Sequence, residues 1–110
     1  MSLKAALERR AVEREALLEE ARVFARRVRE RLGEARVYVF GSVARGDFNL
    51  ESDVDILVVA PNLPTNPLKR QRFLTGLSWG RLEPKGLLPE EYDRLEAKGA
   101  LGFLREGLEV

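Results

Sequence analysis

Two aspartates occupy alternate positions at the start of a mostly apolar run, within the segment GSVARGDFNLESDVDIL at residues 41–57. Because one residue separates Asp53 from Asp55, an extended strand would project both carboxylates from the same face, roughly 6 to 7 Å apart at the backbone. Two carboxylates on one face of a buried strand are costly without cations or hydrogen-bond donors. Their spacing therefore predicts a site for hard divalent cations such as Mg²⁺, which prefers oxygen ligands.

A glycine-serine step precedes these aspartates. Backbone amides without side-chain bulk at Gly41 and Ser42 can hold a phosphate, and the Ser42 hydroxyl can donate to it or cap a short following helix. Arg45, one turn further on, could bind the same phosphate through two N–H groups of its guanidinium. Two alternatives stay open: the step is an ordinary turn, or Arg45 pairs at the surface with Asp47 or Glu51.

A third carboxylate is expected, because two-metal sites hold ions roughly 3.5 to 4 Å apart and two aspartates are rarely enough. Glu83 is the best candidate, since it lies among apolar and basic residues of a predicted strand. It could hold one metal or accept the proton of an attacking hydroxyl. The alternative is a solvated residue paired with Arg81 or Lys85. Secondary candidates, interpreted first as acids of a helix first turn, are Glu90 and Glu91.

The composition excludes several classes of protein. The 110 residues, 45% hydrophobic and 34% charged, are typical of one globular domain, so we expect a single domain over 1–110. A net charge of +1 without a basic patch argues against direct nucleic-acid binding. With no cysteine and no histidine, catalysis must use carboxylates, lysines, hydroxyls or a metal. The lack of a signal-like or membrane-spanning apolar run predicts a cytoplasmic protein that does not bind membranes.

The segment before the motif is predicted to be one long helix over residues 1–32. From Ser2 to Leu32 it has no proline or glycine and is dense in residues that favour helices, and Gly33 is the expected C-cap. In its second half, apolar residues at spacings of three and four form a stripe that would pack on a sheet: Leu17, Ala21, Phe24, Val28 and Leu32.

The first half of this helix is less amphipathic. Leu3 and Leu7 extend a narrow stripe, but Arg10 and Arg14 interrupt it. We therefore expect this end to project into solvent or to contact a partner, and a second copy of the chain in a homo-oligomer is one such partner.

Residues 36–60 are predicted to form a strand-turn-strand unit that carries the motif. Arg36–Phe40 is rich in β-branched and aromatic residues. Val54–Val59 is apolar except for Asp55, as expected of a central strand buried on both faces. The proline-rich residues 61–67 are expected to form a loop.

The rest of the chain is predicted to continue the alternation of helices and strands. A short helix is expected over 68–78, and a third strand over 79–88, which Pro84 and Gly86 would make an edge or bulged strand. Another helix runs from residue 89 to about 98, and the last eleven residues form a helical turn and a tail that packs on the core. The fold class is therefore mixed α/β (α+β), a small mixed β-sheet flanked by helices.

Several basic and aromatic residues lie outside the motif. Lys69, Arg70 and Arg72 are interpreted as a solvated helix face, rather than as contacts to nucleic acid or to a triphosphate tail. Trp79 and Tyr92 could stack on a base, yet in so small a domain aromatic residues usually belong to the core or to an interface.

The pattern G-S-x-A-R-G followed by S-D-x-D on an apolar strand resembles the signature of the polymerase-beta-like nucleotidyltransferase superfamily, in the small stand-alone form called minimal nucleotidyltransferases. The residues that carry the resemblance are Gly41, Ser42, Ala44, Arg45, Gly46, Ser52, Asp53 and Asp55. Many members of the family supply the third acid as an aspartate in a clear strand, whereas here it would be Glu83, followed by Pro84.

The resemblance implies a site and a reaction. Asp53, Asp55 and the third acid would hold Mg²⁺ and act in catalysis. The nucleotide-binding residues would be Gly41, Ser42, Arg45 and Ser52. A nucleoside monophosphate, expected to be AMP from ATP, would be transferred to a hydroxyl of a macromolecular acceptor, with release of pyrophosphate.

The resemblance also implies a partner. Small nucleotidyltransferases often form the antitoxin half of a toxin-antitoxin module whose other half is a HEPN-domain ribonuclease, so the acceptor would be that partner. A non-catalytic antitoxin that neutralises its partner by contact is the alternative, and a nucleotide or metal sensor is a third possibility.

Overall fold

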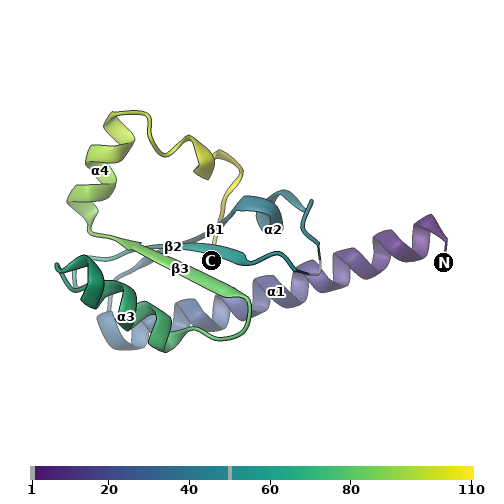
Figure 1. Cartoon of the computed structure of the whole chain (residues 1–110), viewed down its shortest axis with the longest axis horizontal. Coiled ribbons are helices and arrows are strands. Elements are labelled where there is room, and N and C mark those ends of the chain that lie inside the picture. Colours follow the sequence, from purple (N-terminus) through teal and green to yellow (C-terminus); the bar gives the residue numbers. More distant parts are fainter. Residues whose placement is uncertain (1, 50) are drawn as a thin grey trace.

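A computed structural model describes residues 2–49 and 51–110 of the chain. Four strands form one mixed sheet in the order β3-β2-β1-β4, in which β1 is antiparallel to β2 and β4, and β3 is parallel to β2 (Figure 1). The strands are β1 (Arg36–Phe40), β2 (Val54–Val59), β3 (Leu82–Leu87) and β4 (Leu108–Glu109). The mixed sheet and the helices beside it confirm the predicted fold class.

The long helix α1 spans Leu3–Leu32 and crosses one face of the sheet. The Ser2 side chain caps its start by accepting a hydrogen bond from the Ala5 amide at 3.1 Å, and Gly33, with φ of 79°, ends it. The face that α1 buries contains four of the five residues of the predicted apolar stripe and adds Leu18 and Ala25: Leu17, Leu18, Ala21, Phe24, Ala25 and Val28. The fifth, Leu32, is only partly buried against the core. Met1, included in the predicted 1–32 helix, lies outside the described residues.

The first turns of α1 extend past the sheet (Figure 1). Leu3, Leu7 and Val12 are exposed there, by 76%, 58% and 70%. This is the projecting end that the interrupted apolar stripe predicted. Within residues 2–49 and 51–110, no helix combines the length and the apolar character needed to cross a bilayer.

The core lies between the sheet and two helices, α1 and α3 (Pro67–Leu77). Val37 and Val39 of β1 point into it, so Tyr38 and Phe40 point from the opposite face, which we call the second face. Above the second face lie α4 (Pro89–Ala97) and the 3₁₀ helix η1 (Gly102–Glu106), which contact it through aromatic pairs (Figure 1).

The element bounds differ from the sequence predictions mainly after residue 60. The third strand spans Leu82–Leu87 rather than 79–88, because the chain turns at Gly80 with φ of 56° before the strand begins. It lies at the sheet edge, where Pro84 needs no ladder partner on its open side. The predicted tail packs on the core through Leu108 and Val110, and Leu108–Glu109 in addition pairs with β1 as β4.

Arg70 does not belong to the solvated helix face predicted for it. Its side chain is only 6% exposed and forms an ion pair with Glu91 at 2.8 Å. Its guanidinium also donates to three backbone carbonyls, those of Pro64, Thr65 and Gly86. Arg70 therefore ties the proline-rich loop and the start of α4 to β3. Lys69 and Arg72 are exposed, as predicted.

Candidate functional site

The chain turns sharply where β1 ends. Gly41 has φ of 74° and opens the short helix α2 (Gly41–Arg45), which Gly46 ends in the left-handed conformation with φ of 87°. The amides of Gly46 and Asp47 both donate to the Ser42 carbonyl, at 2.9 and 3.1 Å. The short helix predicted to follow the Gly41-Ser42 step is thus present, and it ends at Gly46.

Arg14 of α1 holds α2 in place. Its Nε donates to the Val43 carbonyl at 2.9 Å and its Nη2 to the Ala44 carbonyl at 2.8 Å. These carbonyls are among those left unpaired at the end of a helix. The sequence predicted Arg14 only as an interruption of the apolar stripe, because its partners lie 29 and 30 residues away and leave no local signal.

The three predicted acids meet beside this turn. Asp55 lies opposite Phe40 in the β1–β2 pair and opposite Glu83 in the parallel β2–β3 pair. Asp53, two residues before Asp55, raises the pKa of Glu83, because a second carboxylate nearby favours the protonated form of the Glu83 side chain. Asp53, Asp55 and Glu83 therefore form one group of carboxylates, called the acid cluster below.

The acid cluster carries crowded negative charge. The pKa of Asp55 is raised, first by burial and then by the neighbouring Asp53, while Arg45 and Lys85 act in the opposite direction. Within the described part of the chain, no three acidic side chains are already arranged as a cation site. The donor set fits one nevertheless, because every group is a carboxylate and the excess negative charge is what a divalent ion would neutralise.

Arg45 and Ser52, two of the predicted nucleotide-binding residues, make different contacts near the acid cluster. Arg45 pairs with Asp47 at 3.2 Å, which is the surface pairing held open as an alternative, yet its charge also lowers the pKa of Asp55. The Ser52 hydroxyl accepts from the Asn49 amide at 2.9 Å and donates to its side-chain oxygen at 3.2 Å. In this state Ser52 therefore shapes the loop that leads to Asp53.

The loop before β2 is also held by Arg81. Its guanidinium donates to the Ser52 carbonyl at 2.7 Å and to the Asn49 carbonyl at 2.8 Å. Arg81 is thus engaged with the loop and not with Glu83, which leaves Lys85 as the cation whose charge lowers the pKa of Glu83. Sequence reasoning missed this positioning role because both acceptors are backbone atoms.

Glu90 and Glu91 lie in the first turn of α4, as interpreted from the sequence. Glu91 accepts a hydrogen bond from the Leu88 amide at 2.7 Å and pairs with Arg70. Its carboxylate is therefore already bonded at the start of α4. The pKa of Glu91 is accordingly lowered, chiefly by the Leu88 amide.

Comparison with known proteins gives two named relatives. Over 30 residues the chain is 57% identical to the "Putative protein adenylyltransferase" of Methanocaldococcus jannaschii, a match that covers 27% of this chain and 30% of that protein. The match thus spans less than a third of the relative. The fold is similar to the crystal structure of a "putative nucleotidyltransferase" from Sulfolobus solfataricus, with a TM-score of 0.70 and 26% identity over 91% of this chain and 85% of the other.

The family model described as "Nucleotidyltransferase domain" matches residues 21–101. This range includes the turn at Gly41, the acid cluster and all of α3 and α4. Because the match covers most of the chain, the protein belongs to the nucleotidyltransferase domain family.

Proposed function

We propose that this protein is a Mg²⁺-dependent adenylyltransferase, which moves the AMP group of ATP to a hydroxyl of a protein acceptor. The observation that carries the proposal is the acid cluster lying beside the Gly41-Ser42 turn at one end of the sheet. Acidic side chains next to a glycine-serine turn suit phosphoryl transfer, because catalysis of that reaction consists mostly of positioning the substrates and stabilising charge.

The residues that would hold Mg²⁺ are Asp53, Asp55 and Glu83. When bound, Mg²⁺ stabilises charge on the attacking and leaving oxygens of an in-line displacement. The raised pKa values of Asp55 and Glu83 support this assignment, since both arise in part from neighbouring carboxylates whose repulsion a cation would relieve.

The triphosphate would lie on the Gly41-Ser42 turn. Gly41 carries no side chain to block the backbone, and Ser42 offers a hydroxyl. Arg45, already within electrostatic reach of Asp55, would exchange its exposed partner Asp47 for a phosphate oxygen. Ser52 would take part in nucleotide binding through the loop that it shapes.

The reaction is a simple exchange of bonds. The acceptor hydroxyl oxygen forms a bond to the α-phosphorus, the bond from that phosphorus to the oxygen bridging to the β-phosphate breaks, and pyrophosphate leaves. The hydroxyl proton passes to a carboxylate, for which Glu83 is the candidate because its side chain is exposed on the edge strand β3, where an acceptor can reach it.

A protein acceptor is proposed from two observations. The short match is to a protein whose name describes a protein adenylyltransferase. The projecting start of α1 exposes Leu3, Leu7 and Val12, which is apolar surface suited to contact with another protein. Following the resemblance to minimal nucleotidyltransferases, the acceptor is a HEPN-domain toxin partner, and the chain acts as its antitoxin.

The same exposed leucines favour the second candidate, an antitoxin that neutralises its partner by contact alone. One experiment separates the two. Wild-type protein, Asp53→Asn and the matched control Asp93→Asn, which changes an exposed acid of α4, are incubated with ATP, Mg²⁺ and a HEPN partner, and the partner's intact mass is measured.

Adenylyl transfer predicts that the partner gains the mass of AMP with wild type and with Asp93→Asn. Asp53→Asn should lose on the order of 10²- to 10³-fold in rate. Unmodified partner that is nevertheless neutralised by all three proteins would support the contact mechanism instead. Transfer that survives in Asp53→Asn would contradict the assignment of the acid cluster.

A further inference from the structure

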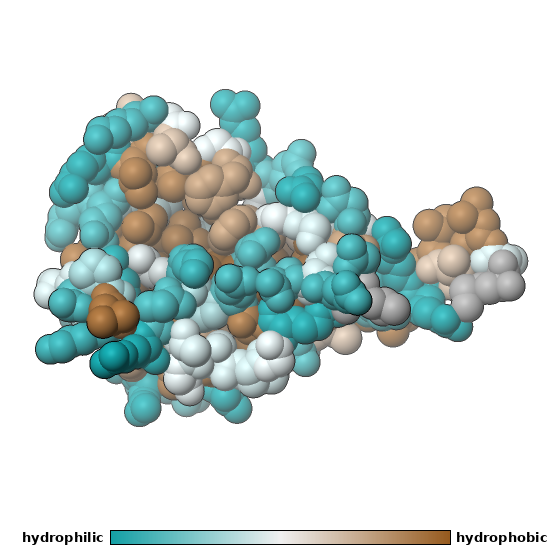
Figure 2. Space-filling model, viewed as in Figure 1, coloured by the Kyte–Doolittle hydropathy of each residue, from teal (hydrophilic) through white to brown (hydrophobic). Residues whose placement is uncertain are grey.

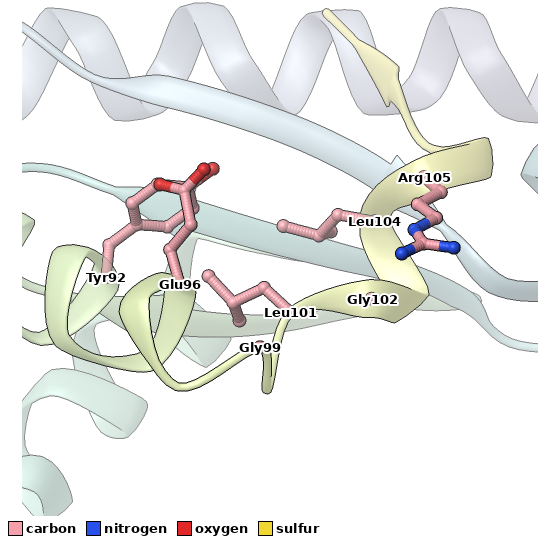
Figure 3. Close-up of a pocket in the computed structure, with 7 residues that line it drawn as sticks. All are labelled: Tyr92, Glu96, Gly99, Leu101, Gly102, Leu104 and Arg105. Carbon is pink, nitrogen blue, oxygen red and sulfur yellow. The ribbon is translucent and has the colours of Figure 1, made fainter.

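A cavity of about 330 Å³ opens between α4 and η1 (Figure 3). Its size is within the range of small-molecule sites. Leu101 and Leu104 point into the space, while Tyr92 and Glu96 lie at one end and Arg105 at the other (Figure 3). The cavity therefore brings leucine and tyrosine side chains together with separate acidic and basic groups.

The elements around the cavity leave apolar surface uncovered. None of the described residues of α4 is buried, although Tyr92 and Leu95 lie on it. Figure 2 shows brown, apolar atoms gathered in the hollow between α4 and the C-terminal segment, with hydrophilic atoms around them. Tyr92 and Leu95 are only partly buried, so α4 has apolar surface left for a ligand.

The cavity lies close to the acid cluster on the second face. The Phe103 ring of η1 contacts the Phe40 ring with centroids 4.9 Å apart, and Phe40 is the strand neighbour of Asp55. Tyr38 lies on the same face as Phe40, about 6 to 7 Å along β1, and contacts the cavity wall through Tyr92. The 3₁₀ helix η1, which forms one wall of the cavity, also contacts α2 and β1, the elements that carry the Gly41-Ser42 turn and Phe40.

The aromatic wall of the cavity is fixed in place. The Tyr92 ring is parallel to that of Tyr38 within 9°, with centroids 6.5 Å apart, and the Arg36 guanidinium lies 4.7 Å from the Tyr92 centroid. By contrast, Glu96 and Arg105 enter no ion pair with other residues of the described segments. Their charged groups are available to a ligand.

We propose that this cavity binds the base of the nucleotide, and that Glu96 selects a base with an exocyclic amine, such as adenine. The inference rests on the proposed function, because it assumes phosphates on the Gly41-Ser42 turn. The Glu96 carboxylate accepts from the amine, Arg105 donates to a ring nitrogen, and the side chains of Tyr92, Leu101 and Leu104 contact the faces of the base.

Two nucleotides test the role of the amine. Purine riboside triphosphate differs from ATP only in lacking the exocyclic amine. Equilibrium affinities for both, with Mg²⁺, are measured by calorimetry for wild type, Glu96→Ala and the control Asp93→Ala, an exposed acid on the same helix that does not line the cavity. Both substitutions remove exposed side chains, so the fold should tolerate them.

Wild type should bind ATP about tenfold more tightly than purine riboside triphosphate, since a hydrogen bond to a charged group is lost with the amine. Glu96→Ala should bind ATP about tenfold more weakly than wild type but should bind purine riboside triphosphate as wild type does, so the preference for ATP disappears. Asp93→Ala should retain the preference. Equal binding of the two nucleotides to wild type, or an unchanged preference in Glu96→Ala, would overturn the inference.

Inorganic tripolyphosphate separates this inference from the proposed function. With Mg²⁺ it should bind wild type and Glu96→Ala equally, but more weakly than ATP binds wild type. If ATP binds no more tightly than tripolyphosphate, the cavity does not hold the base, although the phosphate and metal site stands. If neither ATP nor tripolyphosphate binds with Mg²⁺, the proposed function and the cavity inference both fail.

Discussion

The Asp55 carboxylate lies directly against the backbone of Gly41. A Cβ atom built on Gly41 would overlap Oδ2 of Asp55 and lie 3.3 Å from its Cγ, and Gly41 has φ of 74°. The Gly41-Ser42 turn and Asp55 of β2 are therefore in contact, although 14 positions separate Gly41 from Asp55 in the sequence. Glycine is needed here both for backbone conformation and for space.

The substitution Gly41→Ala should remove nucleotidyl transfer and destabilise the protein. The new methyl group must displace the Asp55 carboxylate, in addition to the roughly 1 to 2 kcal/mol that a non-glycine residue costs in the left-handed region. Gly99→Ala is the matched control, because Gly99 has φ of 73° but nothing within 4 Å of an added Cβ. Chemical denaturation and AMP transfer are measured on both variants. An equal loss of stability and full activity in both would contradict the contact.

Neutralising Asp55 should stabilise the metal-free protein at neutral pH. Burial and Asp53 raise the pKa of Asp55 above its ordinary value of 3.8, so the folded state binds the proton more tightly than the unfolded state. The free energy of unfolding then falls as pH rises from the unfolded pKa to the folded pKa. Above the folded pKa, the charged form of Asp55 destabilises the folded state. Asp55→Asn removes this destabilising charge and also removes a proposed Mg²⁺ ligand.

The melting temperature of Asp55→Asn without Mg²⁺ should therefore exceed that of wild type at neutral pH and converge with it below pH 3.8. Added Mg²⁺ should raise the melting temperature of wild type more than that of the variant, because ligands that bind only the folded state stabilise it. Asp93→Asn, on exposed surface, should follow wild type throughout. A lower melting temperature of metal-free Asp55→Asn at neutral pH would show that the Asp55 charge is compensated in the folded state.

Removing the Arg14 side chain should loosen α2. Its two hydrogen bonds to the carbonyls of Val43 and Ala44 join charged donors to backbone acceptors in a half-buried setting, so Arg14→Ala should cost about 1.5 to 3 kcal/mol of unfolding free energy. Amide hydrogen exchange should accelerate at Gly46 and Asp47, whose amides donate to Ser42. Arg9→Ala, an exposed neighbour on α1, serves as the control. Unchanged exchange at both amides would show that α2 does not depend on Arg14.

Local patterns in the sequence were sufficient to predict most of the elements. β1 and β2 have the predicted bounds because their β-branched runs are bracketed by glycine and by polar loops. The closeness of Asp53 and Asp55 was expected from strand alternation, although Asp53 immediately precedes β2 and does not lie in it. Glu83 was harder, since its place beside Asp55 depends on β3 pairing in parallel with β2, a long-range contact that no local pattern encodes.

The features that sequence reasoning missed are all long-range contacts. β4 has only two residues and forms by pairing with β1, so its own sequence gives no strand pattern. The sequence predicts Arg70 to be one of several solvated basic residues of a helix. It is buried instead, because loop carbonyls and Glu91 surround its guanidinium. The cavity between α4 and η1 likewise depends on how the C-terminal segment returns to the sheet.

The ion pair between Arg70 and Glu91 should make stability sensitive to acid. The Leu88 amide, then Arg70, lowers the pKa of Glu91 below its ordinary value of 4.5. A depressed carboxyl pKa contributes stability that is present above the unfolded pKa and is lost as pH falls through the folded pKa. Glu91→Gln keeps an oxygen acceptor for the Leu88 amide but removes the charge, and with it this pH-dependent contribution.

Glu91→Gln should therefore be less stable than wild type at neutral pH, with the difference shrinking as pH falls below 4.5. Glu90→Gln is the matched control, because Glu90 is the adjacent exposed acid of the same first turn and has no ion pair within the described residues. Urea unfolding of the three proteins across this pH range tests the expectation. Parallel stability curves for wild type and Glu91→Gln would mean that Arg70 is held by its backbone acceptors alone, since those carbonyls do not titrate.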